Sequence, residues 1–466
     1  MNIAYIYEDD PLFERKIENA TAGLKPACKK ILKRVSKTNA VIIADYITSM
    51  QTEMNPSNDY KKAIIMLLCK FSQINKDKTF KQTTRQDVLS FLERFRKPET
   101  ADSLHKWIGT YNLYGIYLLR FFKWLYHPDV EPNKRAKPPV VENIPQLKRK
   151  EQSIYKPSDL WSQEDDLLFL RYCPSKRMKC YHAMSRDTGC RPHELLKLRI
   201  KDVIFKNTGD KQYAEVLLTG KTGSRHIPLI DSLPYIKDYL DHEHPQPTNF
   251  NASLFAGKRK SLGRQISVIT LYAIYDSYKK NLFPKLLHNP VSVPSADKQR
   301  IRDLLRKPWN PYIRRHSALT DKSLFLKEHV LKQHAGWSPR SQMHLKYLHY
   351  FGNESSDSIL EAHGIITKDQ KGSTAMRSKQ CPNCGEPNKP DNHFCAKCRL
   401  VLSYDAYNET LEEQKKKEDK LAVIEDKFNI MQSQMQSLLS IMGSVNNGEQ
   451  KREIAKRLIE EGIYEA

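Results

Sequence analysis

Two short turns in the chain place a cation where it could bind an anion. Arg191 lies in the turn GCRP, which opens the amphipathic stretch HELLKL. A guanidinium at a helix N-terminus adds a planar set of donors to backbone N–H groups that already favour negative charge. Lys221 stands between glycines in TGKTGSR, a tight turn from which a lysine can project toward a ligand. The ordinary alternative for each residue is a solvated surface cation.

The segment NPYIRRHSALT begins a predicted helix, because Asn310 is a good N-cap and Pro311 suits the first helical position. On that helix Tyr312 and Arg315 share a face, whereas Arg314 is rotated by about 100°. If the face of Tyr312 borders a site, Arg315 points into that site. Arg314 is then expected to be a backbone contact or a solvated charge.

A third pattern is typical of metal binding. The stretch CPNCGEPNKPDNHFCAKC contains two Cys-x-x-Cys pairs, Cys381 with Cys384 and Cys395 with Cys398. Two such turns complete a tetrahedral set of four thiolates that selects Zn²⁺. Protein ligands fill all four positions, so we expect one zinc ion per chain with a structural role. The nearby His393 is not needed as a ligand.

Taken in order, several segments resemble the boxes of the tyrosine recombinase (phage-integrase, Xer-like) family, with features of its archaeal-type integrases. TGCRPHELLKLRIKDV resembles the first box, in which an arginine, here Arg191, grips the scissile phosphate. TGKTGSRHIPLI resembles the hairpin that presents the catalytic lysine, here Lys221. YIRRHSALT aligns with the His-x-x-Arg-His box and puts its catalytic arginine at Arg315. HAGWSP followed by YLHY resembles the last box, with Trp337 before the nucleophile Tyr347.

This resemblance covers residues 58–350 and implies site-specific DNA recombination through a covalent 3′-phosphotyrosine, without metal or nucleotide in the chemistry. In the mechanism that the resemblance implies, the hydroxyl of Tyr347 would attack a phosphodiester, and two arginines would neutralise the charge of the transition state. In the same implied mechanism, Lys221 would protonate the departing 5′ oxygen. Trp337 donates a hydrogen bond through its indole N–H or packs the site.

The sequence departs from the family pattern at Tyr312, which stands where most members have histidine. A phenol with a pKa near 10 can donate a hydrogen bond to phosphate but is a poor general base at neutral pH. We keep Tyr312 among the candidate catalytic residues as a tolerated variant. His316 and His334 are expected to be structural.

The elements that must position these residues are mainly helical, with one small β-sheet. An apolar alternation predicts a strand pair at 213–219 and 225–230, and Thr84 with Asp87 is placed to cap a helix. The expected order is an N-terminal helical extension (1–57), a core-binding helical DNA-clamp domain (58–128), a basic linker (129–153), a mixed α/β tyrosine-recombinase catalytic domain (154–365), a zinc ribbon (381–400), a coiled-coil helix (405–445) and a short C-terminal helix (446–466).

The coiled coil is predicted from a stripe of apolar residues at alternating three- and four-residue steps. Its members are Leu421, Ile424, Phe428, Met431, Met435, Leu438 and Met442. Recombinases of this family work as tetramers on paired sites, so the resemblance favours a homo-oligomer. The alternative is a helix that docks on its own protein.

Composition agrees with a partner that is a polyanion. The 466 residues include 77 Lys and Arg against 54 Asp and Glu, a net charge of +23, which favours double-stranded DNA. Five scattered cysteines suit a reducing cytoplasm rather than a disulfide framework. The most apolar stretch, 111–126, is too short to span a bilayer and contains Arg120 and Lys123, so no membrane partner is expected.

Two other functions fit the same residues. One is a non-catalytic DNA-binding or regulatory protein on a recombinase scaffold, and the other is a type IB topoisomerase-like enzyme that relaxes DNA. Retention of Arg191, Lys221, Arg315 and Tyr347 together speaks against a decayed site. The sequence does not identify the DNA target, or whether the reaction is integration, excision or dimer resolution.

Overall fold

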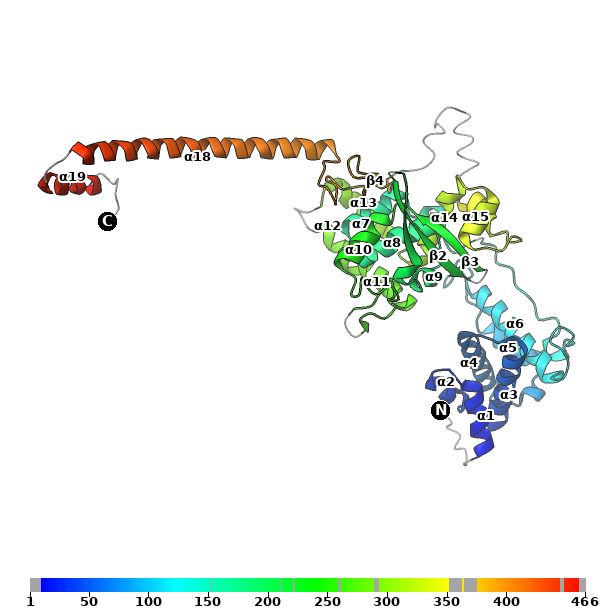
Figure 1. The fold of residues 1–466 in the computed structure, drawn as a ribbon. Helices are drawn as coiled ribbons and strands as arrows, with labels where there is room; N and C mark the ends of the chain where they lie inside the picture. Colours follow the sequence, from blue (N-terminus) through cyan, green and yellow to red (C-terminus); the bar gives the residue numbers. More distant parts are fainter. Residues whose placement is uncertain are drawn as a thin grey trace. The chain divides into compact units, whose positions relative to one another are not determined.

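The computed structural model describes residues 10–151, 153–209, 211–220, 223–258, 261–288, 293–351, 363, 375–444 and 448–460. The chain divides into two compact units between Ile154 and Tyr155. Each unit has its own hydrophobic core, and the expected mainly helical fold with a small sheet is confirmed (Figure 1).

The first unit is built from helices. They are α1 (Pro11–Thr21), α2 (Pro26–Leu32), α3 (Lys37–Met54), α4 (Asn58–Ile74), α5 (Arg85–Glu93) and α6 (Trp107–Tyr126). The capping box predicted at the start of α5 is present: the Thr84 hydroxyl accepts from the backbone N–H of Asp87, whose carboxylate accepts in return. Buried residues from α1 to α6 share one core, so the boundary expected after residue 57 does not divide the described residues.

Much of the segment expected to be an extended linker packs onto this first unit. Val140 and Val141 are buried in a short 3-10 turn, and Arg135 is buried with its guanidinium on the carboxylate of Glu53. The prolines prevent a helix here, as expected, but an extended chain can still bury apolar side chains. The packed segment reaches at least Leu147, whose backbone N–H and carbonyl both bond the side chain of Asn112.

In the second unit, helices pack against a three-stranded antiparallel sheet. Its elements up to the candidate site are α7 (Gln163–Tyr172), α8 (Lys176–Thr188), α9 (Pro192–Leu196), β1 (Val203–Thr208), β2 (Lys211–Gly220), β3 (Gly223–Leu229), α10 (Leu233–His242), α11 (Val268–Ser277), α12 (Phe283–Leu287), α13 (Ser295–Arg306), α14 (Pro311–Ser323), α15 (Glu328–Ala335) and α16 (Met343–Leu345), followed by a π-helical turn at Lys346–Phe351. A further π-helical turn, Tyr278–Leu282, joins α11 to α12.

The sheet has one strand more than the sequence predicted. β2 and β3 form the expected hairpin, with Val216 opposite Ile227 and Gly220 opposite Gly223. The additional strand, β1, pairs along the other edge of β2. Only Val203 of β1 is buried, so this strand lacks the apolar alternation by which a half-buried strand is recognised.

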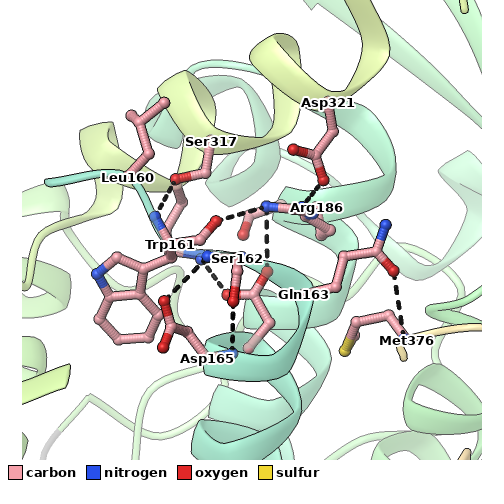
Figure 2. Close-up of polar contacts among 12 residues, drawn as sticks. Leu160, Trp161, Ser162, Gln163, Asp165, Arg186, Ser317, Asp321 and Met376 are labelled. Carbon is pink, nitrogen blue, oxygen red and sulfur yellow. Dashed lines mark hydrogen bonds and ion pairs between the residues drawn. The ribbon is translucent and has the colours of Figure 1, made fainter. Parts of the chain in front are cut away.

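Buried polar contacts fix α14 against the start of α7 and the end of α8. The backbone N–H of Trp161 donates to the Ser317 hydroxyl at 2.8 Å. The guanidinium of Arg186 donates to the Trp161 carbonyl at 3.2 Å and forms an ion pair with Asp321 on α14 (Figure 2). These contacts tie together segments that are far apart in the sequence, and they hold in place the helix that carries Arg315.

Arg314 completes this anchor, which corrects the expectation that it is a backbone contact or a solvated charge. Its side chain has no exposed surface, it forms an ion pair with Asp166 on α7, and its guanidinium carbon lies 5.2 Å from the centre of a Trp161 ring. Asp166 also bonds His182 at 3.1 Å. The rotation of about 100° that turns Arg314 away from Arg315 turns it into the interior.

The chain after the candidate site contributes to the core of the second unit and adds the cysteine cluster. Met376 is buried in the core of the second unit, and its backbone N–H lies 3.4 Å from the Gln163 side-chain oxygen (Figure 2). Short strands β4 (Lys379–Gln380) and β5 (Pro387–Asn388) follow. The cluster is attached to α10 by ion pairs of Lys237 with Glu386 at 2.6 Å and of Lys389 with Asp238 at 2.5 Å.

Two helices end the described chain, α18 (Tyr404–Ser444) and α19 (Gly448–Glu460). The described members of the apolar stripe on α18 are about 60 % exposed. Across the described ranges, none of the helices combines the length and apolar character needed to cross a membrane.

Candidate active site and metal centre

Tyr347 lies at the centre of the predicted site. It is 1 % exposed, and its ring centre lies 5.3 Å from that of Trp337. Burial raises the pKa of its hydroxyl, and the positive charges of Arg315 and Arg191 oppose that rise. The Tyr347 phenol is therefore influenced by residues from separate elements. They are Arg191 at the start of α9, Arg315 on α14 and Trp337 just after α15.

Arg315 joins three of the predicted boxes through hydrogen bonds. Its guanidinium donates to the carbonyl of Gly189 at 2.7 Å and to that of Ala335 at 2.9 Å, and it lies 5.7 Å from the centre of a Trp337 ring. The side chain is 5 % exposed, and burial lowers its pKa. Two fixed carbonyls thus set the direction of this cation beside Tyr347.

The local sequence explains why α14 presents Arg315 in this way. The Asn310 side chain accepts from the backbone N–H groups of Tyr312 and Ile313, both at 3.0 Å, so the predicted N-cap is confirmed. Arg315 then follows one turn into the helix, on the buried side. Tyr312, in the first turn, is 37 % exposed.

Arg191 begins α9 and is held by the buried carboxylate of Glu194, to which its guanidinium donates at 3.0 Å. The second oxygen of Glu194 accepts from Arg225 on β3 at 2.8 Å. Burial alone would raise the pKa of Glu194, but Arg225 and Arg191 lower it overall. Arg225 also donates to the carbonyl of His334 at 2.8 Å, so β3, α9 and α15 are joined at the site.

Gly336 ends α15 in a left-handed conformation, with a φ of 65°. A side chain there would be strained, and its Cβ would lie only 2.7 Å from an Arg225 nitrogen. The HAGW motif therefore needs its glycine to bring Trp337 beside Arg315.

Lys221 lies outside the described residues, as does the side chain of Tyr350. The glycines that flank the predicted lysine turn, Gly220 and Gly223, pair at the end of β2 and β3. The catalytic role of Lys221, and those of Arg191, Tyr312, Arg315, Trp337 and Tyr347, stay predictions.

Among the described residues, His316, Arg225 and Glu194 contact these groups, and the sequence predicted a functional role for none of them. His316 lies beside the Tyr347 hydroxyl, with 3.1 Å between its Nδ1 and the phenolic oxygen, whereas we expected it to be only structural. Arg225 and Glu194 link the first box to the hairpin and the last box. The sequence offered one signal for a role of Arg225 and Glu194. Arg225 lies in TGKTGSR close to Lys221, and Glu194 lies in RPHELL close to Arg191.

The four predicted zinc ligands lie together. The sulfur atoms of Cys381, Cys384, Cys395 and Cys398 all lie within 4.8 Å of one another, with 3.5 Å between Cys381 and Cys398. With Zn–S bonds of about 2.3 Å, a tetrahedral Zn²⁺ needs sulfur atoms roughly 3.8 Å apart. The cluster therefore fits a closed zinc site.

The backbone around the cysteines supports the same interpretation. The N–H of Gly385 bonds the carbonyl of Cys381, and the N–H of Arg399 bonds that of Cys395, which gives two similar turns. Asn388 is fully buried, with its amide nitrogen 3.7 Å from the Cys395 sulfur. This amide orients one thiolate and connects the cluster to β5.

Replacing Cys395 with serine is expected to weaken zinc binding by more than the roughly 10- to 100-fold that loss of a supporting residue costs. The thiolate is a direct ligand, and the serine hydroxyl is a poor substitute for it. Zinc content per chain after competition with a chelator measures this effect. His393→Ala is the matched control and should keep its zinc. Equal zinc retention in Cys395→Ser and the wild type would contradict the four-cysteine site.

Comparison with solved structures finds similar folds at low identity. XerH site-specific recombinase, in a post-cleavage complex with palindromic difH substrate, has 16 % identity and a TM-score of 0.48, covering 78 % of this chain and 100 % of that chain. Tn1549 transposon integrase in complex with transposon right end DNA has 15 % identity and a TM-score of 0.43, covering 69 % and 99 %. A lambda integrase tetramer bound to a Holliday junction has 12 % identity and a TM-score of 0.41, covering 72 % and 90 %.

No protein-family model and no curated protein matches the sequence. Sequence identities of 12 to 16 % to solved structures do not establish a function. A functional assignment must therefore be argued from the residues of the site. In fold, the chain is similar to these solved site-specific recombinases and integrases.

Proposed function

We propose that the chain is a site-specific DNA recombinase that cleaves and rejoins DNA through a covalent 3′-phosphotyrosine. The observation that supports this most is the buried Tyr347 hydroxyl under the charges of Arg315 and Arg191, beside Trp337. Four segments that are distant in sequence contribute to this arrangement. A structural tyrosine needs no pair of arginines beside its hydroxyl.

The proposed mechanism uses the chain's own side chains. Tyr347 attacks the phosphorus of a DNA phosphodiester, and the bond to the 5′ oxygen breaks. Arg191 and Arg315 stabilise the negative charge on the non-bridging oxygens, with Arg315 preoriented by two carbonyls. Lys221 protonates the departing oxygen. The phosphotyrosine retains the bond energy, which a second DNA end recovers when it attacks.

Double-stranded DNA is the proposed partner. The net charge of +23 favours a polyanion, and the helical unit formed by α1–α6 is the proposed clamp on the duplex. We assign zinc a structural role: it would hold together the two cysteine turns, which ion pairs attach to α10.

The test separates recombination from simple relaxation. A duplex is first selected by the protein from a randomised DNA pool, and two copies are placed in a supercoiled plasmid. We expect deletion or inversion of the DNA between the copies, detected by restriction mapping. Relaxation of the plasmid without rearrangement would favour the topoisomerase-like alternative. Binding without any covalent adduct would favour the non-catalytic one.

The exposed stripe on α18 is proposed to pair with other copies of the chain. Leu421, Ile424, Phe428, Met431 and Met435 are 59 to 64 % exposed, and they follow coiled-coil spacing.

Changing both Ile424 and Met431 to aspartate is expected to shift the protein from an oligomer to a monomer. Two charges in the apolar seam would have to be buried without partners. Light scattering after size exclusion, with and without the selected DNA, measures the mass. Ser433→Asp, off the stripe on the same helix, is the control and should leave the mass unchanged. An unaltered mass for the double variant would argue against the coiled coil.

A further inference from the structure

The Tyr347 hydroxyl has an imidazole as its neighbour. The phenolic oxygen lies 3.1 Å from Nδ1 of His316, and the two rings are stacked with centres 5.7 Å apart and 22° between their planes. His316 follows Arg315 directly on α14. One helical turn therefore carries both a cation for the phosphate and a nitrogen base for the nucleophile.

We propose that His316 accepts the proton that Tyr347 loses when it attacks the phosphodiester. This inference rests on the proposed function, because it assigns a residue to that same reaction. The hydrogen-bond length already suits proton transfer between the two groups. His316 touches the reacting oxygen, so its role is catalytic in the strict sense.

The charge state of His316 suits an acceptor. Burial lowers its pKa to about 3, and the charges of Lys346 and Arg315 act in the same direction, so the imidazole is neutral at pH 7. The ring of Tyr155 also lies near it, with 5.3 Å between the two ring centres. Because burial also raises the pKa of Tyr347, the phenol keeps its proton until an acceptor takes it.

Bound DNA is what makes this imidazole an effective base. Without substrate, two neighbouring cations disfavour the imidazolium. A phosphodiester beside Arg315 brings a negative charge that offsets them and raises the pKa of His316. Proton transfer is then coupled to the presence of substrate, which limits attack by Tyr347 on anything else.

Tyr312 is a weaker candidate for the same task. A phenol is a poorer general base than an imidazole, and the side chain of Tyr312 is 37 % exposed. His316 lies four residues later, so it shares the helix face of Tyr312 one turn further along. In this chain the His-x-x-Arg-His box has Tyr312 in place of its first histidine. The last histidine of the box, His316, would take over the function of the missing one.

The step balances without any co-reactant. As the bond from Tyr347 oxygen to phosphorus forms, the phenolic proton moves to Nδ1 of His316. The bond from phosphorus to the 5′ oxygen breaks, and that oxygen takes a proton from the ammonium of Lys221. In rejoining, a 5′ hydroxyl gives its proton to Lys221, and the departing Tyr347 oxygen recovers its proton from His316.

The experiment compares His316→Ala and His316→Asn with the wild type in single-turnover adduct formation on the selected duplex, nicked to trap the adduct. We expect each variant to be slower by about 100- to 10,000-fold, the usual contribution of a general base. A second substrate carries sulfur in place of the bridging 5′ oxygen, so its leaving group needs no proton. The His316 defect should persist on that substrate, whereas the defect of the control variant Lys221→Ala should largely disappear.

A second arm separates proton transfer from a structural role. Fluorotyrosine at position 347 is more acidic and should recover part of the rate in His316→Ala. Rates within about threefold of wild type for both His316 variants, a defect cured by the sulfur substrate, or one that fluorotyrosine leaves unchanged would each overturn the inference. If the wild type forms an adduct that Tyr347→Phe loses, the proposed function stands whatever His316 does. If the wild type forms no adduct on either substrate, both fall.

Discussion

Replacing Tyr347 with phenylalanine is expected to abolish the covalent protein–DNA adduct. The substitution removes one oxygen and leaves the ring in its contacts with Trp337 and His316. The fold and DNA binding should therefore persist while the nucleophile is lost, and the expected reduction is at least about 10,000-fold. The measurement is retention of labelled DNA by protein on a denaturing gel, with the selected duplex nicked near the cleavage position.

The matched control is Tyr350→Phe, three residues further along, which should keep the adduct. DNA binding by both variants shows whether either substitution has a wider effect. An undiminished adduct in Tyr347→Phe would remove Tyr347 from the proposed mechanism, and Tyr350 and Tyr312 would become the next candidates.

Replacing Asp166 with asparagine is expected to lower the free energy of unfolding of the second unit by about 3–5 kcal/mol. Asp166 is fully buried and pairs with Arg314 and Arg186, and it bonds His182. Burial alone would raise the pKa of Asp166, but the charges of Arg314 and Arg186 bring it well below its ordinary value. Asparagine leaves the buried guanidinium of Arg314 without its counter-charge, which is the costly case for a buried ion pair, and it removes one of the two carboxylates that pair with Arg186.

Urea denaturation followed by circular dichroism measures this loss. Asp276→Asn is the control, because its ion pair with Lys280 is exposed and should contribute too little to resolve. An Asp166→Asn protein as stable as the wild type would show that the arginines find other partners. Adduct formation should fall with stability, because Arg315 is adjacent to Arg314 on the same helix.

Patterns that depend on neighbours in the chain could be predicted well. Asn310 and Pro311 begin α14, and the hairpin glycines lie at the end of β2 and β3. The two Cys-x-x-Cys turns bring four sulfur atoms together. In each case the residues that decide the geometry lie within a few positions of one another, so the sequence contains the necessary information.

Features that depend on which elements pack together could not be predicted. Helix geometry showed that Arg314 points away from Arg315. It could not show that Asp166, which lies far earlier in the chain, forms an ion pair with Arg314. The contact between His316 and Tyr347 likewise depends on how the π-helical turn packs on α14. The strand β1 was missed because its side chains face mainly solvent.

The position of Met376 affects the order in which the second unit can fold during synthesis. This residue belongs to the core of the second unit, and Ser378 then bonds Asp231 next to α10, yet both are synthesised after Tyr347. A nascent chain that ends shortly after Tyr347 therefore still lacks part of this core. The core of the second unit is thus complete only after the segment around Met376 and Ser378 has been synthesised.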